Sequence, residues 1–153
     1  MEEVIWPSSL QSLSYGHTFN QRLHGVTWPI SLQSISFGND FNQSLQGVTW
    51  PSSLRCLSFA DGLNQTLEGV TWPSSLQRLS LSSRFSQSLA TVEWPSSLQS
   101  LSFTSHGGQG SSLQVKEVGA VLPRGLRSLD FWCNDDELLS ISFEGLTPAT
   151  SAT

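Results

Sequence analysis

The chain has 153 residues, a length that fits one domain, and 37% of them are hydrophobic, which is enough to build a core. Only 12% are charged, about half the usual share, and the formal net charge of −5 argues against a nucleic-acid partner. No apolar run approaches the roughly 18–20 residues that a membrane helix needs, so no membrane-spanning segment is expected.

A repeat of 22 residues dominates the sequence. Five tryptophans recur at this spacing, each followed by a proline: Trp6, Trp28, Trp50, Trp72 and Trp94. The consensus unit is V-T-W-P-S-S-L-Q-S-L-S-F-G-x-x-F-N-Q-S-L-x-G, and GVTWPSSL stands letter for letter at residues 47–54 and 69–76. A regular period of this length predicts a solenoid, in which each unit is one coil and stacked coils share a core.

The repeats account for most of the chain. Residues 1–3 form a leader, and six coils are predicted in residues 4–131. The sixth coil has Leu122-Pro123 in place of Trp-Pro and arrives six residues late, because a Ser- and Gly-rich insertion loop near 105–112 interrupts the pattern.

The C-terminal region keeps the repeat only weakly. Residues 132–145 are expected to form a degenerate coil or cap, with one last strand in 138–143. Residues 146–153 (LTPATSAT) are expected to be a loose tail.

Each unit contains one short strand, in the segment L-Q-S-L-S-F. Its second leucine and its aromatic residue alternate with serines, which is a period of two, and equivalent strands of successive coils should pair in parallel. The Trp-Pro step favours an extended or polyproline-like back without a hydrogen-bonded sheet, because proline has no N–H. No unit carries a helical pattern. The fold class predicted is mainly β, with a parallel sheet on one face and little or no helix. Gly25, Gly47 and Gly69 mark a tight corner before each new coil.

Two columns of residues are expected inside the coils. The tryptophans could form an exposed aromatic surface or belong to the core, and the core is the expectation; each buried indole N–H would then need a partner. Asn20, Asn42 and Asn64 are expected to stack as an inward-facing ladder whose amides satisfy backbone groups. Asn42 and Asn64 also start glycosylation sequons, but an inward ladder argues against modification.

The unit resembles a leucine-rich repeat, in the strand segment Leu32-Gln33-Ser34-Ile35-Ser36-Phe37 and its equivalents. More narrowly it resembles the FNIP repeat family, because Pro29-Ile30-Ser31-Leu32 through Phe37 is followed by Phe41-Asn42. It is also similar to the short bacterial leucine-rich repeats. The resemblance covers residues 4–131 and implies a right-handed solenoid that acts as a protein-interaction scaffold. It brings no catalytic motif, and in leucine-rich repeats the residue matching the tryptophan points inward.

In leucine-rich repeats the exposed residues of the strand face usually bind the partner. Alternation assigns to this face Ser12, Ser14, Ser34, Ser36, Cys56, Ser58, Arg78, Ser80, Ser100, Ser102, Ser128, Asp130, Ser140 and Ser142. A face of serines could simply be a small, polar filler surface, since binding hot spots favour Trp, Tyr and Arg.

The positions that break the repeat are the best candidates for specificity. Arg78, Asp130 and Trp132 stand out, and Trp132 is either an interface anchor or a cap over the last coil. The loop around His106 is either a tolerated insertion or a binding loop. Segment 130–144 holds five acids and no base, so it is either a solvated cap or a patch for a basic partner. The residues predicted to contact a partner are Ser34, Ser36, Cys56, Ser58, Arg78, Ser80, Ser100, Ser102, His106, Asp130 and Trp132.

Catalytic and metal-binding motifs are not found. There is no G-x-x-x-x-G-K-[ST] phosphate loop and no G-x-S-x-G elbow, and the three histidines are isolated. The acidic segment matches no calcium-loop spacing. We therefore expect no enzyme activity, no cofactor and no metal.

The compartment is not fixed by the sequence. The N-terminus MEEVIWPSS lacks the basic and apolar regions of a signal peptide. Cys56 and Cys133 lie three repeats apart, about 14 Å at the spacing of paired strands, which is too far for a disulfide. Free thiols favour a reducing compartment, so these features lean toward the cytoplasm.

Three functions remain open at this point. The first is a non-enzymatic protein-recognition or scaffold module that binds through the strand face and the acidic C-terminal end. The second is an accessory structural subunit, docked in a larger assembly by its open N-terminal coil, because repeat arrays need covered ends. The third is a hydroxyl ladder that binds a glycan or ice.

Overall fold

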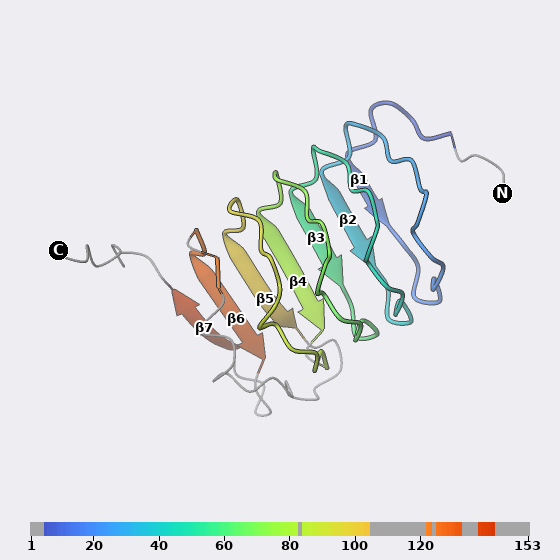
Figure 1. Ribbon diagram of the computed structural model, residues 1–153. Helices are drawn as coiled ribbons and strands as arrows, with labels where there is room; N and C mark the ends of the chain where they lie inside the picture. Colours follow the sequence, from blue (N-terminus) through green and yellow to red (C-terminus); the bar gives the residue numbers. More distant parts are fainter. Residues whose placement is uncertain (1–4, 83, 105–121, 124, 133–137, 143–153) are drawn as a thin grey trace.

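The computed structural model describes residues 5–82, 84–104, 122–123, 125–132 and 138–142. Within these ranges, only the backbone is described for Thr104, Phe131, Trp132, Leu138 and Leu139. Seven strands form one sheet in chain order (Figure 1). They are β1 (Ser12–Ser14), β2 (Ser34–Phe37), β3 (Cys56–Phe59), β4 (Arg78–Ser82), β5 (Ser100–Thr104), β6 (Ser128–Trp132) and β7 (Leu138–Ser142).

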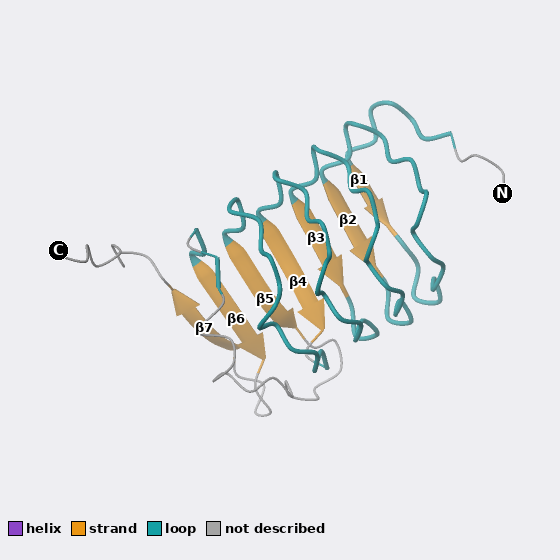
Figure 2. Cartoon of the chain, in the orientation of Figure 1, coloured by secondary structure: helices purple, strands orange, loops and turns teal. Residues whose placement is uncertain are grey.

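The strands β1 to β6 are parallel, and the described loops that join β1 to β5 cross one face of the sheet (Figure 2). The described part of the chain contains no helix. The sequence prediction of a mainly β solenoid with a parallel sheet on one face is therefore confirmed.

The register of the sheet follows the repeat. Leu13 pairs with Ile35, Ile35 with Leu57, and the same step continues through Leu79 and Leu101. Leu101 then pairs with Leu129, so the late sixth coil returns to the same column. An insertion between two coils does not shift the sheet, because the apolar side chains set which face each residue takes.

The last strand differs from the rest. A strand was predicted in 138–143, and β7 is there, but it pairs with β6 in the antiparallel sense, so the expectation of parallel pairing is wrong here. Because β6 ends at Trp132 and β7 begins at Leu138, five residues join them. A parallel return needs a dozen or more residues, whereas a short connection forms a hairpin. This favours the cap over a further coil; the division of the chain at residues 3, 131 and 145 stays a prediction.

The core lies between the sheet and the back. Leu32, Leu54, Leu76 and Leu98 have no exposed surface, and the phenylalanines stack from coil to coil, with the rings of Phe37 and Phe59 5.1 Å apart. Full burial of such a side chain contributes about 1.5–3 kcal/mol. Because neighbouring coils supply the same shapes, the core is continuous along the stack.

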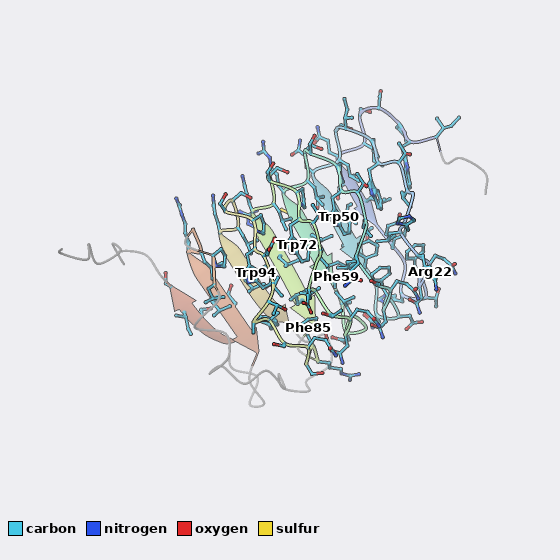
Figure 3. All side chains as sticks on the ribbon, in the orientation of Figure 1. Arg22, Trp50, Phe59, Trp72, Phe85 and Trp94 are labelled. Carbon is cyan, nitrogen blue, oxygen red and sulfur yellow. The ribbon has the colours of Figure 1, made fainter. Side chains whose placement is uncertain are left out.

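The tryptophan column is buried, as predicted, at Trp28, Trp50 and Trp72, which are 7–8% exposed, while Trp6 and Trp94 are half-buried. Figure 3 shows Trp50, Trp72 and Trp94 following one another along the stack. The rings of Trp28 and Trp50 are 6.1 Å apart and nearly parallel. The partners that buried indole N–H groups need are not found among the described residues: the Nε1 atoms of Trp28, Trp50, Trp72 and Trp94 are buried and have no acceptor there. Stacking satisfies the ring faces but brings no acceptor to the ring edge.

The asparagine ladder is present. Asn20 Oδ1 accepts the backbone N–H of Asn42 at 3.0 Å, Asn42 Oδ1 accepts that of Asn64 at 3.0 Å, and Asn64 Oδ1 accepts that of Ser86 at 2.9 Å. The prediction that these side chains face inward is wrong, since Asn20 and Asn42 are exposed. Each amide reaches along the stack at the rim of the coil and need not enter the core. Burial is therefore no argument against glycosylation at Asn42.

The corners are built as expected. Gly25, Gly47 and Gly69 adopt φ of 77°, 69° and 69°, in the left-handed region that glycine tolerates best. Each corner closes one coil and starts the next.

Candidate functional site

The outward side chains of the parallel strands form two rows. Because the intervening leucines and aromatic residues point into the core, every second residue is left on the strand face. The register places the first row as Ser12, Ser34, Cys56, Arg78, Ser100 and Ser128, and the second row as Ser14, Ser36, Ser58, Ser80, Ser102 and Asp130. Neighbours within a row are one strand spacing apart, about 4.8 Å.

Hydrogen bonds link some neighbours within the rows. Ser36 Oγ donates to Ser14 Oγ at 2.9 Å. In the first row the guanidinium of Arg78 lies 3.9 Å from the sulfur of Cys56, which is a free, half-buried thiol. Since most of the other side chains in the two rows are short hydroxyls, the rows are smooth, and Arg78 is the long side chain within them.

A shallow hollow of about 400 Å³ lies at the carboxyl ends of β1 to β4. It is bounded by the second-row serines and by the turn after each strand, namely Ser14, Ser36, Ser58, Ser80, Gly16, His17, Gly38, Asn39 and Ala60. Tyr15, Phe37 and Phe59 supply its apolar surface, and burial raises the pKa of the Tyr15 hydroxyl above its usual value. Pockets that bind small ligands have volumes of about 300–1,000 Å³, so the volume of this hollow lies near the low end of that range.

Sequence reasoning missed two groups of residues on this face. His17 and Asn39 line the hollow although they belong to turns. Arg55 and Arg127 lie one residue before the outward position of β3 and β6, in the column next to that of Arg78, and all three arginines are exposed. The signal was available, because their column is otherwise glutamine: Gln11, Gln33, Gln77 and Gln99.

Not every predicted contact residue is brought to the face. Asp130 lies in the second row, half-buried, opposite Ser102 on β5 and Ser140 on β7, and Ser140 and Ser142 are exposed as predicted. Trp132 ends β6 opposite Leu138, but its side chain is outside the description. His106, the insertion loop, Cys133 and the acids of 135–137 also lie outside the described residues.

The described residues offer no metal centre, since no group of three or more His, Cys, Asp and Glu side chains is close enough to hold an ion. The described residues also contain no helix that is long and apolar enough to cross a membrane.

The β1 end of the solenoid is a second surface of interest. Leu10, Leu13, Tyr15 and Phe19 are only partly buried there, whereas their counterparts one coil later are in the core. Ile5 and Ile30, beside this end, are 91% and 86% exposed. Figure 1 shows that β1 has a neighbouring strand on one side only.

Comparison with known proteins agrees with this architecture. The FNIP repeat pattern matches residues 19–62 and 64–106, more than half of the chain. No match was found among curated proteins. A solved structure described as CroV588, a novel circular LRR protein, is similar with 30% sequence identity and a TM-score of 0.56. The match covers 82% of this chain and 21% of that chain, so this chain spans about a fifth of the length of its solved relative. The repeat match, the one-strand coils and the Asn ladder lead to one conclusion: this chain belongs to the FNIP repeat family.

Proposed function

We propose that the protein is a non-enzymatic protein-recognition or scaffold module that binds its partner through the strand face and the acidic C-terminal end. The observation that carries the proposal is the pair of in-register rows, which presents Cys56, Arg78 and Asp130 on a rigid sheet beside the 400 Å³ hollow. A rigid sheet loses little entropy when it binds, and an exposed arginine such as Arg78 is the kind of side chain that forms a hot spot.

Two variants test the strand face. Ser80→Arg places a long cation in the second row at the border of the hollow, and Ser74→Arg places the same side chain on the exposed back of the same coil. Each variant and the unchanged chain serve as bait for affinity capture, with the unfolding free energy measured in parallel. The proposal requires a partner that is retained by Ser74→Arg and lost by Ser80→Arg, with both variants folded. A partner retained by both would exclude the strand face.

A second candidate function is that of a subunit docked in a larger assembly by its first coil. The half-exposed apolar residues at the β1 end favour it, because an uncovered sheet edge with an apolar flank is a liability for a free protein. Here the partner would be retained by Ser80→Arg and lost when the β1 edge is altered.

A further inference from the structure

The interfaces between successive coils have a direction. Outside the strand ladder, the contacts that recur in at least three interfaces all have the donor on the later coil and the acceptor on the earlier one. A serine hydroxyl donates to a leucine carbonyl one coil back in Ser31→Leu10, Ser53→Leu32, Ser75→Leu54 and Ser97→Leu76, at 2.6–2.7 Å. The backbone N–H groups of the Asn ladder have the same polarity.

Two more contacts repeat this polarity. The glutamine after each ladder position donates its Nε2 to the asparagine of the earlier coil, as Gln43 does to Asn20 at 2.9 Å. The two N–H groups that start each strand share one carbonyl of the earlier coil, as Gln33 and Ser34 share that of Gln11. In these recurring contacts each coil offers donors on its upstream side and acceptors on its downstream side. Single contacts run the opposite way, such as Gln46 Nε2 to the Glu68 carbonyl and Asn64 Nδ2 to Ser86 Oγ.

At the β1 end this donor set is unused. By the 22-residue step, the equivalent donors are the Ser9 hydroxyl, the N–H groups of Gln11, Ser12 and Asn20, and the Gln21 side chain. Within the part of the chain that the structure describes, no acceptor reaches them. They face the same way as the open edge of β1.

The apolar part of the same surface is also incomplete. Trp6, Leu10, Leu13, Tyr15 and Phe19 are half-buried, whereas their equivalents Trp28, Leu32, Ile35, Phe37 and Phe41 are 0–7% exposed. A hollow of about 340 Å³ between the first two coils, bounded by Ile5, Trp6, Trp28 and Ile30, adjoins this end. The surface at the β1 end thus has the same donors, apolar residues and strand edge that each later coil uses to contact the coil before it.

A second copy of this chain does not supply the complement. At its other end the edge of β6 is paired with the antiparallel β7, so among the described residues that end does not offer the edge of a parallel coil. Two copies joined β1 to β1 could pair only their strand edges, in the antiparallel sense, and would set the serine, glutamine and ladder N–H donors of one copy against those of the other.

We propose that the β1 end binds one further coil of the same 22-residue repeat, whose downstream acceptors are exposed and which another polypeptide supplies. Its strand would extend the sheet in parallel beyond β1, and its asparagine would accept the N–H of Asn20. The inference rests on the second candidate function above and names its partner: a repeat array with an uncapped downstream end.

The test measures binding of the full chain to a fluorescein-labelled 44-residue peptide that copies residues 26–69, two complete coils, by fluorescence polarisation. Ser12→Pro removes a donor at the first position of an edge strand, where proline is best tolerated, and Ser12→Thr is the matched control. We expect saturable 1:1 binding, a dissociation constant about tenfold weaker for Ser12→Pro, and no change for Ser12→Thr. A peptide with both Asn42→Ala and Asn64→Ala should also bind more weakly, because it lacks the acceptors.

The outcomes separate this inference from the proposed function. Ser80→Arg lies on the strand face, so it should leave binding of the peptide unchanged. Absence of peptide binding, or equal binding to Ser12→Pro and Ser12→Thr, overturns the inference even if Ser80→Arg abolishes capture of a partner. A chain that dimerises alone through β1, measured by light scattering and not reversed by the peptide, also overturns it, since the occupant would then be a second copy.

Discussion

The Asn ladder yields the sharpest stability prediction. Asn42→Ala removes the Oδ1 atom that accepts the Asn64 N–H at 3.0 Å and the Gln65 side chain at 3.1 Å. Each hydrogen bond contributes about 0.5–1.5 kcal/mol net, and water can reach the exposed rim to replace part of it. We therefore expect a loss of about 1 kcal/mol in the free energy of unfolding, at the low end of what buried bonds would give.

Chemical denaturation of the purified chain measures this loss, and two variants control for it. Asn39→Ala makes the same change at an exposed turn in the same coil, where no hydrogen bond to the side chain is present, so its effect should stay within about 0.5 kcal/mol. Asn42→Asp keeps the acceptor oxygen and should stay close to the unchanged chain. If Asn42→Ala and Asn39→Ala cost the same, the ladder does not stabilise the stack and the reasoning is refuted.

Three further predictions concern the core, a corner and the one tyrosine. Leu57→Ala should lower the free energy of unfolding by about 2–5 kcal/mol, because Leu57 is 1% exposed in the centre of the stack; a loss below 1 kcal/mol in denaturation would contradict a close-packed core. Gly47→Ala should cost about 1 kcal/mol at φ 69°, whereas Gly16→Ala, where a Cβ meets nothing within 4 Å, should be near neutral in the same assay. The raised pKa of Tyr15 means that the folded state favours the neutral phenol, so stability should fall as pH rises past the unfolded tyrosine pKa of about 10. Because the chain has a single tyrosine, ultraviolet titration reports it directly, and a midpoint at or below 10 would be inconsistent with its burial.

The architecture could be predicted because the same 22-residue pattern recurs in every coil, so each copy supports the same assignment. A 22-residue step with alternating apolar residues leaves one way to bury Leu13, Ile35, Leu57 and their equivalents, and the sheet register follows. The same logic correctly assigned the two outward rows. It failed at β7, where the connection is too short for a coil, because connection length rather than pattern sets the strand direction there.

The side-chain environment was harder to predict. We predicted that the ladder asparagines face inward, but each amide oxygen accepts a hydrogen bond from the next coil at the exposed rim of the stack. The sequence pattern required a partner for each buried tryptophan N–H, but it could not show that stacking of identical rings brings no acceptor to four of them among the described residues. The hollow and its turn residues His17 and Asn39 depend on how neighbouring coils curve over the sheet, which a one-dimensional pattern does not contain.

The polarity of the stack also emerged only in three dimensions. A repeat of serines, glutamines and asparagines gives no sign of which side of a coil donates. The hydrogen bonds show it, and they make the β1 end a surface with a defined complement rather than merely an exposed edge.

The most direct test of strand-face recognition is to follow the reactivity of Cys56. This thiol is free and half-buried in the first row, beside Arg78 at the centre of the face. Its rate of alkylation, measured by mass spectrometry of the peptide that carries it, needs no substitution in the chain. Binding of the captured partner should slow alkylation of Cys56 in proportion to occupancy. An unchanged rate at saturating partner would contradict recognition through this face.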